Sequence, residues 1–427
     1  MSQNANDLVG SRSSTACGAV TASTGFPPKA EERRARDHGA PSNMFLAAVP
    51  IAFAASATVV ELLLRAPQTF FHPQLFAEDG PVFFAQAHTD GAASVFVAYA
   101  GYLNLLPRLV ALAATMFSAV FTPKIYCWSA VAAAVWSSAT IASTPIRFSW
   151  IFGACLAAAP HNGEVFGVLL NVQWILAPAL FLIVATRPPQ SRLARYNQIV
   201  FAFVSALTGP FCVAAAPVVL WRGIRRRSLF DATICLIVAS ASIIQLCLAL
   251  AASSEPTGTS TSPLKVAAII LYRDLNLIPT SAVKFDGLHL VAIFSLAIVL
   301  AVGALGRESQ WKALLLSAGV TLSALVWIKF RHLPPDLLMP IGGGDRYFYI
   351  PHVLVVWMLL DTLLTGRLAS VPAGALVAAA ISGSSHSWHK PSLPLWDWKT
   401  DALKVDHGEA VKIPINPPGW TIELPSK

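Results

Sequence analysis

Two adjacent carboxylates, Glu78 and Asp79, lie in the run Phe76–Gly80, between two long apolar segments. A charged side chain at the centre of a bilayer costs about 2.5–3.5 kcal/mol on insertion scales, so acids beside membrane spans usually have a partner or a purpose. A carboxylate placed here could act as a general base that takes a proton from an acceptor hydroxyl. The alternative is structural, because an acid just ahead of Pro81 is also how a short helix begins.

Two arginines much later in the chain could act with this acidic pair. Arg273 and Arg346 could hold a leaving phosphate through bidentate hydrogen bonds and stabilise the charge that develops on it. Tyr347, next in the sequence, joins them as a candidate substrate contact. Each arginine also has a simpler interpretation. Arg273 beside Asp274 could form an exposed ion pair worth under about 1 kcal/mol, and Arg346 could anchor the start of an apolar span.

Four further polar residues are candidates for substrate contact: Tyr102, Asn104, Glu164 and Asn171. Tyr102 and Asn104 could instead be interface and capping residues, and Glu164, which follows an Asn-Gly pair, could favour a helix N-terminus. Asn171 lies inside an apolar run, where an amide should face the protein interior. Hydrogen bonding between helices explains that amide as easily as substrate contact does. Three histidines are too scattered to suggest a metal site: His161, His289 and His352.

The composition indicates the class of protein that must position these residues. The chain has 427 residues, of which 55% are hydrophobic and 12% charged. Soluble domains average about 25% charged residues, so the sequence predicts an integral membrane protein. The net charge of +8 comes mainly from short Lys and Arg clusters between apolar runs, as the positive-inside rule produces, and it does not indicate nucleic acid. The six cysteines include no Cys-x-x-Cys pair, so neither a zinc site nor a disulfide framework is indicated.

We expect an all-α polytopic membrane protein with about 10–12 membrane segments, short re-entrant or half helices among them, and a small external C-terminal cap. Residues 1–43 read as a disordered cytoplasmic tail, although either Met1 or Met44 could start the protein. Residues 44–383 form the multi-span domain, with external loops at 65–102, 252–286 and 329–346. Residues 384–427 form the cap, in which Val411–Ile413 and Thr421–Leu424 are predicted strands around a Pro-Gly turn.

Most of the expected spans are continuous apolar runs: Met44–Leu64, Leu103–Phe121, Ile125–Ser143, Val165–Ala185, Leu229–Ala251, Gly287–Leu305, Ala313–Ile328, Tyr347–Leu364 and Leu368–Ser382. Two segments differ. Phe148–Pro160 is too short to cross and suits a re-entrant or interfacial piece. Asn197–Trp221 has arginines at both ends and Thr208-Gly209-Pro210 at its middle, so we expect a hairpin of two half helices that lines an interior cleft.

The acidic Ala77–Gly80 run in the first external loop, the many spans and the loops interleaved with short helices resemble the GT-C class of membrane glycosyltransferases. The resemblance implies a polyprenyl-phosphate sugar as donor and an envelope glycan or lipid-linked molecule as acceptor, on the outer face of the membrane. It also implies that Glu78 or Asp79 supplies the catalytic base. The expected location is the bacterial inner membrane, with the N-terminus cytoplasmic and the C-terminus periplasmic. No cofactor is expected; a divalent cation is compatible with these residues, but no pattern indicates one.

Two other functions fit a multi-span chain. A transporter or flippase for a lipid-linked glycan would be expected to show internal repeats and charges distributed along a path through the membrane. No repeat is visible, and the charges gather in loops assigned to one face, although Glu61 and Asp361 are candidate intramembrane acids. A non-enzymatic scaffold would use the C-terminal cap as a binding module, with the Glu-Asp pair pointing to bulk water.

Overall fold

The computed structural model describes several stretches of the chain: residues 41–252, 263–275, 277, 309–332, 338, 344–365, 370–384 and 388–426. The predicted span Gly287–Leu305, most of the N-terminal tail and much of the predicted second and third external loops lie outside the described residues. The chain divides into two compact units, residues 1–47 and 48–427. In the first unit the described part is the beginning of helix α2 (Pro41–Arg65), which starts three residues before the predicted span.

Five helices in the described part of the chain are long and apolar enough to cross a membrane, which is consistent with a helical membrane protein. They are α2, α6 (Thr122–Ala142), α12 (Leu229–Ala251), α15 (Ser309–Phe330) and α16 (Arg346–Thr365). The sequence predicts α12 with the same bounds, and α15 and α16 each exceed their predicted spans by a few residues. A shorter apolar helix, α17 (Ser370–Ser384), replaces the predicted last span and includes the first residue assigned to the cap.

The predicted span Leu103–Phe121 is wrong. The helix found in this run, α5 (Leu105–Ala114), has ten residues, or about 15 Å of helix. That is half of the length needed to cross a membrane. The chain then turns, and Asp406 from the C-terminal region accepts hydrogen bonds from the Ser118 hydroxyl and from the Ala119 N–H at 2.8 Å. A residue almost 300 positions away thus contacts the chain where an apolar run that looks continuous in the sequence is interrupted.

The predicted span Val165–Ala185 is helical only in its second part. Helix α8 covers Val172–Ala185, and all fourteen of its residues are buried, so it is a core helix. Residues 163–171 form irregular backbone in which Gly163 and Gly167 have positive φ angles of 83° and 67°. At Gly167 a Cβ atom would lie 2.5 Å from the side chain of Thr69, so the loop packs too closely for any other residue.

The predicted break at Thr208-Gly209-Pro210 is confirmed, but three helices rather than two half helices flank it. Helix α9 (Arg192–Ala206) ends before the Thr-Gly-Pro turn, and two short helices follow, α10 (Phe211–Ala214) and α11 (Ala216–Arg225). The break frees backbone groups that must find partners in an apolar interior. Gln245 of α12 supplies them, because its amide donates to the carbonyls of Leu103 (3.1 Å) and Gly209 (3.0 Å) and accepts from the Leu103 N–H (2.8 Å). The other predicted short piece contains a single helix, α7 (Ser149–Ala154).

The predicted first external loop is largely helical. It contains α3 (Pro67–Phe71), a 3₁₀ turn (Ala77–Asp79), a π-helical turn (Gly80–Phe84), α4 (Ala85–Asp90) and a second 3₁₀ segment (Gly91–Phe96). The described part of the predicted second loop holds α13 (Pro263–Leu275).

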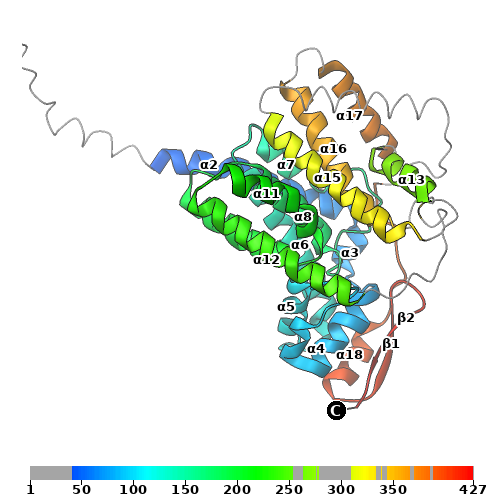
Figure 1. The fold of residues 1–427 in the computed structure, drawn as a ribbon. Helices are drawn as coiled ribbons and strands as arrows, with labels where there is room; N and C mark the ends of the chain where they lie inside the picture. Colours follow the sequence, from blue (N-terminus) through cyan, green and yellow to red (C-terminus); the bar gives the residue numbers. More distant parts are fainter. Residues whose placement is uncertain are drawn as a thin grey trace, which may run out of the picture. The chain divides into compact units, whose positions relative to one another are not determined.

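The C-terminal region consists of α18 (Trp398–Asp406) and an antiparallel hairpin, β1 (Val411–Ile415) and β2 (Trp420–Leu424). Both predicted strands are confirmed, in a register that pairs Ile413 with Ile422 and Ile415 with Trp420. The buried isoleucines of the hairpin face the protein, and Figure 1 shows the two strands beside α18.

Candidate functional site

The C-terminal hairpin supports the acid motif, by which we mean Ala77–Gly80. The Ala77 N–H donates to the Asn416 carbonyl at 2.5 Å, and the Asn416 N–H donates to the Leu75 carbonyl at 3.3 Å. These bonds pair the chain around Phe76 in parallel with residue 416. A Cβ atom on Gly80 would lie 2.6 Å from the side chains of Ile415 and Ile422, so the hairpin packs directly on the motif.

The two acids of the motif have different environments. Asp79 is 2% exposed, and its Oδ1 accepts a hydrogen bond from the Leu170 N–H at 2.9 Å. Burial raises the pKa of Asp79 to about 7, although the backbone N–H groups of Leu170 and Leu169 oppose the shift. Glu78 is only partly buried, and its Oε1 accepts a hydrogen bond from the Tyr99 hydroxyl at 2.9 Å. Glu78 is therefore the carboxylate that a molecule arriving from outside could reach.

A tight turn brings the phenol of Tyr99 to this carboxylate and places Tyr102 close by. Tyr99 and Tyr102 exchange backbone hydrogen bonds of 2.9 and 3.1 Å around Gly101, whose φ is 82°. Burial, and after it the Glu78 carboxylate, raise the pKa of Tyr99, so its hydroxyl stays a donor. The Tyr102 hydroxyl accepts a hydrogen bond from Gln173 Nε2 at 3.4 Å, and burial raises the pKa of Tyr102 as well.

Glu164 and Arg346 form an ion pair at the same place. Arg346 Nη1 lies 3.0 Å from Glu164 Oε1, and the Arg346 backbone N–H donates to Oε2 at 3.3 Å. Burial raises the pKa of Glu164 while Arg346 opposes the shift. The Arg346 guanidinium also interacts electrostatically with Glu78, and Asn171 donates to the Glu164 carbonyl at 3.0 Å. The structure thus brings together Glu78, Glu164, Asn171 and Arg346, four of the residues that the sequence proposes for the site.

Tyr347 belongs to an aromatic cluster on the other side of Arg346. Its hydroxyl accepts a hydrogen bond from Lys329 Nζ at 2.8 Å, and its ring centroid lies 5.2 Å from that of Trp174 and 4.8 Å from that of Phe330. Lys329 and Arg346 both interact electrostatically with Tyr102, which links this cluster to the Tyr99–Tyr102 turn. Sequence reasoning missed Lys329 as a site residue, because a lysine that ends an apolar run looks like an ordinary interface residue.

Arg273 lies next to this group but is tied to the protein. Its guanidinium pairs with Asp345, donates to the Leu338 carbonyl at 2.6 Å and covers the ring of Phe348 at 4.0 Å. Asp345 directly precedes Arg346, so Arg273 fixes the start of α16 and thereby places Arg346. Its geometry favours positioning over phosphate binding.

Asn104 is fully buried at the start of α5, but its side chain makes no capping hydrogen bond. Asn104 thus occupies the N-cap position of α5, as one interpretation of the sequence expects, but its side chain does not cap the helix. Within the described residues its amide has no hydrogen-bond partner, and the same holds for Asn171 Oδ1, Gln173 Oε1 and Trp174 Nε1. Buried polar atoms of this kind usually bond to water or ligand. The unpaired atoms of Gln173 and Trp174 lie on side chains that contact Tyr102 and Tyr347, respectively.

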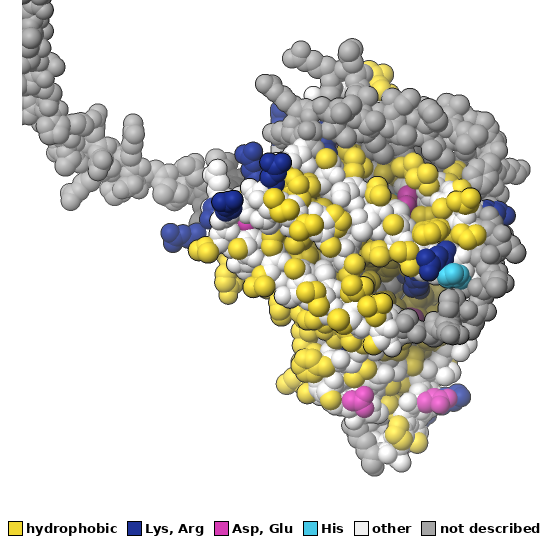
Figure 2. All heavy atoms as spheres, in the orientation of Figure 1, with side chains coloured by type: hydrophobic (Ala, Val, Ile, Leu, Met, Phe, Trp, Pro, Cys, Tyr) yellow, Lys and Arg dark blue, Asp and Glu magenta, His cyan; other side chains and the backbone are white. Residues whose placement is uncertain are grey.

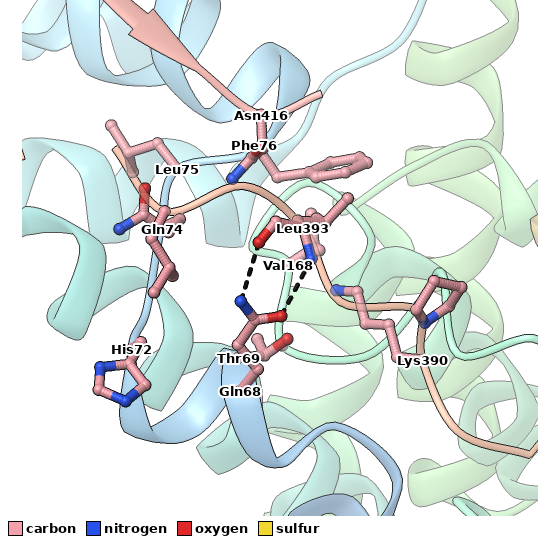
Figure 3. Close-up of a pocket in the computed structure, with 13 residues that line it drawn as sticks. Gln68, Thr69, His72, Gln74, Leu75, Phe76, Val168, Lys390, Leu393 and Asn416 are labelled. Atoms are coloured by element: carbon pink, nitrogen blue, oxygen red, sulfur yellow. Dashed lines mark hydrogen bonds between the residues drawn. The ribbon is translucent and has the colours of Figure 1, made fainter. Parts of the chain in front are cut away.

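The C-terminal strap, residues 388–397, crosses behind the acid motif and lines a small pocket (Figure 3). Gln68 holds the strap with paired hydrogen bonds to the backbone of Leu393, at 2.8 and 3.0 Å, and Gln74 holds Trp396 at 3.4 and 3.1 Å. Lys390 points into the pocket and donates to the Phe166 carbonyl at 3.0 Å. Burial lowers the pKa of Lys390 to about 8, although Cys127, Asp79 and Glu164 oppose the shift.

Figure 2 shows a hollow on one face, beside one end of α15, with Lys or Arg side chains in and next to it. No group of three or more His, Cys, Asp or Glu side chains within the described ranges could hold a metal ion. The chain is mostly helical, with helices apolar enough to span a membrane, and it carries a polar cluster of acids, cations, phenols and amides. Neither the comparison with protein-family models nor the search of curated proteins gave a match to this chain.

Proposed function

We propose that this protein is a membrane glycosyltransferase of the GT-C type, which transfers a sugar from a polyprenyl-phosphate donor to an envelope glycan or lipid-linked acceptor. The proposed location is the outer face of the bacterial inner membrane. The observation that carries the proposal is the placement of the half-buried Glu78 carboxylate beside the Arg346–Glu164 ion pair. A base and a phosphate-binding cation placed close together are what such a transfer requires.

In this proposal Glu78 is the general base and takes the proton of the acceptor hydroxyl as that oxygen attacks the anomeric carbon. The Tyr99 hydroxyl orients the Glu78 carboxylate. Arg346 and Lys329 stabilise the phosphate that departs with the polyprenyl chain, because a guanidinium binds phosphate oxygens with two N–H groups. Glu164 holds the Arg346 guanidinium in place. Asp79 has a structural role, because its carboxylate is buried against the Leu170 backbone.

The test is transfer of labelled sugar from polyprenyl-phosphate donors by the full chain in membranes. Glu78→Gln should lower the rate by about 10²–10⁴-fold, the usual contribution of general base catalysis. Glu409→Gln, at an exposed acid of the C-terminal region, is the matched control and should leave the rate unchanged. A Glu78→Gln protein that folds and keeps its transfer rate contradicts the assignment.

One observation favours the alternative of a lipid-linked glycan transporter. Lys312 and Asp361 form a buried ion pair between the candidate spans α15 and α16; Lys312 is 4% exposed and Asp361 is 5% exposed. Charges inside spans often mark a transport path. If transport is the function, Asp361→Asn should abolish movement of a lipid-linked glycan across reconstituted vesicles, and Glu78→Gln should leave that movement intact.

A further inference from the structure

A second charged surface lies on the connections around α9 and α11. Five exposed arginines form it, and we call them the arginine rim: Arg187, Arg192, Arg195, Arg225 and Arg227. Three of them lie between α8 and the first turn of α9, and two lie at the end of α11 and before α12. Figure 2 shows a group of Lys or Arg side chains over α11 and the adjoining end of α12, bordered by apolar side chains.

Two inner arginines hold these connections together. Arg222 is fully buried and donates to the carbonyls of Val184 (3.0 Å) and Thr186 (3.2 Å) at the end of α8. Arg226 donates to the Ala185 carbonyl at 3.2 Å. The carboxylate of Asp231 lies 2.7 Å from Arg222 and 4.0 Å from Arg226. The inner arginines therefore use the available carboxylate and carbonyl groups, and they fix the backbone that carries the rim.

The rim itself is not neutralised by the described part of the protein. No ion pair among the described residues joins a carboxylate to any of its five arginines. Arg195 does donate through Nε to the Pro189 carbonyl at 2.6 Å, which fixes its direction without adding negative charge. Arg187 and Arg226 repel each other. A fixed group of like charges of this kind favours an external polyanion.

Large apolar side chains stand exposed beside the rim. Leu193 is 80% exposed and Tyr196 70%, both on α9, and Leu220 and Ile224 are each 67% exposed on α11. Leu229, at the start of the candidate span α12, is 89% exposed. Exposed apolar residues next to cations at the end of a span are typical of the level of the lipid headgroups. A soluble polyanion such as nucleic acid would not cover these apolar side chains.

We propose that the arginine rim binds the phosphate groups of anionic phospholipids, with the neighbouring apolar side chains in contact with the acyl chains. Guanidinium groups match phosphate oxygens in bidentate geometry. A basic residue near an anionic membrane surface strengthens binding by about fivefold, so several acting together give a marked preference over zwitterionic lipid. This inference does not depend on the proposed transfer reaction.

The experiment is a titration of the purified full chain with phosphatidylglycerol or phosphatidylcholine, in which native mass spectrometry counts the lipids retained. The wild type should retain phosphatidylglycerol at least about tenfold more strongly. A variant with Arg187, Arg192, Arg225 and Arg227 all changed to Gln should lose this preference. The variant with the same four changed to Lys should keep most of it, which separates loss of charge from a failure to fold.

The matched control removes four exposed cations elsewhere: Arg147, Lys399, Lys404 and Lys412, each changed to Gln. This control should bind phosphatidylglycerol as the wild type does. The inference is overturned if the wild type shows no preference, or if the rim variant and the control lose it equally. Complete displacement of the lipid by inorganic phosphate would reassign the rim to soluble anions and would also overturn it.

Discussion

At the candidate site, the carboxylates of Glu78 and Glu164 are bonded to other side chains of the protein, whereas at the arginine rim five guanidinium groups are exposed. Glu78 is bonded by Tyr99, and Glu164 by Arg346, 182 positions later in the chain. The rim is built from a short stretch of sequence and keeps its charge unpaired within the described residues. This difference indicates that paired charges held in a fixed geometry are suited to the proposed reaction on a single bound molecule. Unpaired charges are suited to binding a mobile and abundant anion.

The largest effect on stability is expected beneath the rim. Asp231→Ala leaves the buried Arg222 without its carboxylate, and breaking a buried pair in this way costs about 3–5 kcal/mol. Denaturant unfolding in detergent should show the loss. Asp401→Ala, which removes an exposed pair with Lys404, is the control and should leave the unfolding transition nearly unchanged. Equal effects of the two substitutions would mean that the inner arginines do not support the rim.

A smaller effect is expected where the hairpin packs on the acid motif. Gly80→Ala places a Cβ atom 2.6 Å from Ile415 and Ile422, and overpacking of this kind costs about 1–3 kcal/mol. Thermal unfolding should show the loss, and the proposed transfer should fall with it because Glu78 moves. Gly223→Ala is the control, since its Cβ would meet only Cys235 at 3.8 Å. A wild-type melting temperature for Gly80→Ala would show that the hairpin shifts to accommodate the added Cβ atom at little cost.

The pH dependence of stability tests the burial of Asp79. Burial raises the folded-state pKa of Asp79 from 3.8 to about 7, so the folded state prefers the protonated acid. The contribution of Asp79 is therefore most favourable below about pH 4 and declines as the pH rises towards 7. Melting temperatures of the wild type and Asp79→Asn, measured from pH 5 to 8, should diverge, with the variant gaining relative to the wild type as pH rises.

Three groups near Asp79 bear on this measurement: Glu78, Lys390 and the buried Tyr126. The pKa of Lys390 is lowered to about 8, so its titration enters at the upper end of the range. Lys390→Met in the Asp79→Asn background separates the two contributions. A constant difference between wild type and Asp79→Asn over the whole range would show that Asp79 is ionised throughout.

The smallest effect is expected at the glutamine contacts of the strap. Gln68→Ala removes two short hydrogen bonds to Leu393, worth about 1 kcal/mol each, and Gln74→Ala removes a longer pair to Trp396. Hydrogen exchange of residues 390–396 should speed up in both variants, and more so in Gln68→Ala. Faster exchange in Gln74→Ala than in Gln68→Ala would reverse this order.

The sequence predicts those helices whose boundaries are set locally. Helix α12 begins directly after Ser228, whose side chain caps its N-terminus, and it continues through an uninterrupted apolar run. Its bounds can therefore be read directly from the sequence. The runs 103–121 and 165–185 look equally continuous, but each is interrupted in the structure, and at the interruptions they contact Asp406 and Asp79 from distant segments. Apolar periodicity carries no information about such tertiary partners.

The residues of the candidate site divide in the same way, into those that the sequence indicates and those that only the fold reveals. Glu78, Glu164 and Arg346 stand out in the sequence because charges beside apolar spans are unusual, and the structure places them together. Tyr99 and Lys390 give no local signal, since a tyrosine in a loop and a lysine near a proline are ordinary there. Their importance comes from the turn at Gly101 and from the strap, neither of which can be located without the fold.

The pairing of Ala77 with Asn416 sets an order of events in the making of this protein. The ribosome adds residues at about 5–20 per second, so the first loop emerges well before the chain that must lie against it. Until the segment around Asn416 has been synthesised and delivered, the Glu78 turn lacks two of its backbone bonds and the packing on Gly80. A nascent chain would thus enter the membrane with its acid motif unsupported, and the site proposed above would form only after the segment around residue 416 had been made.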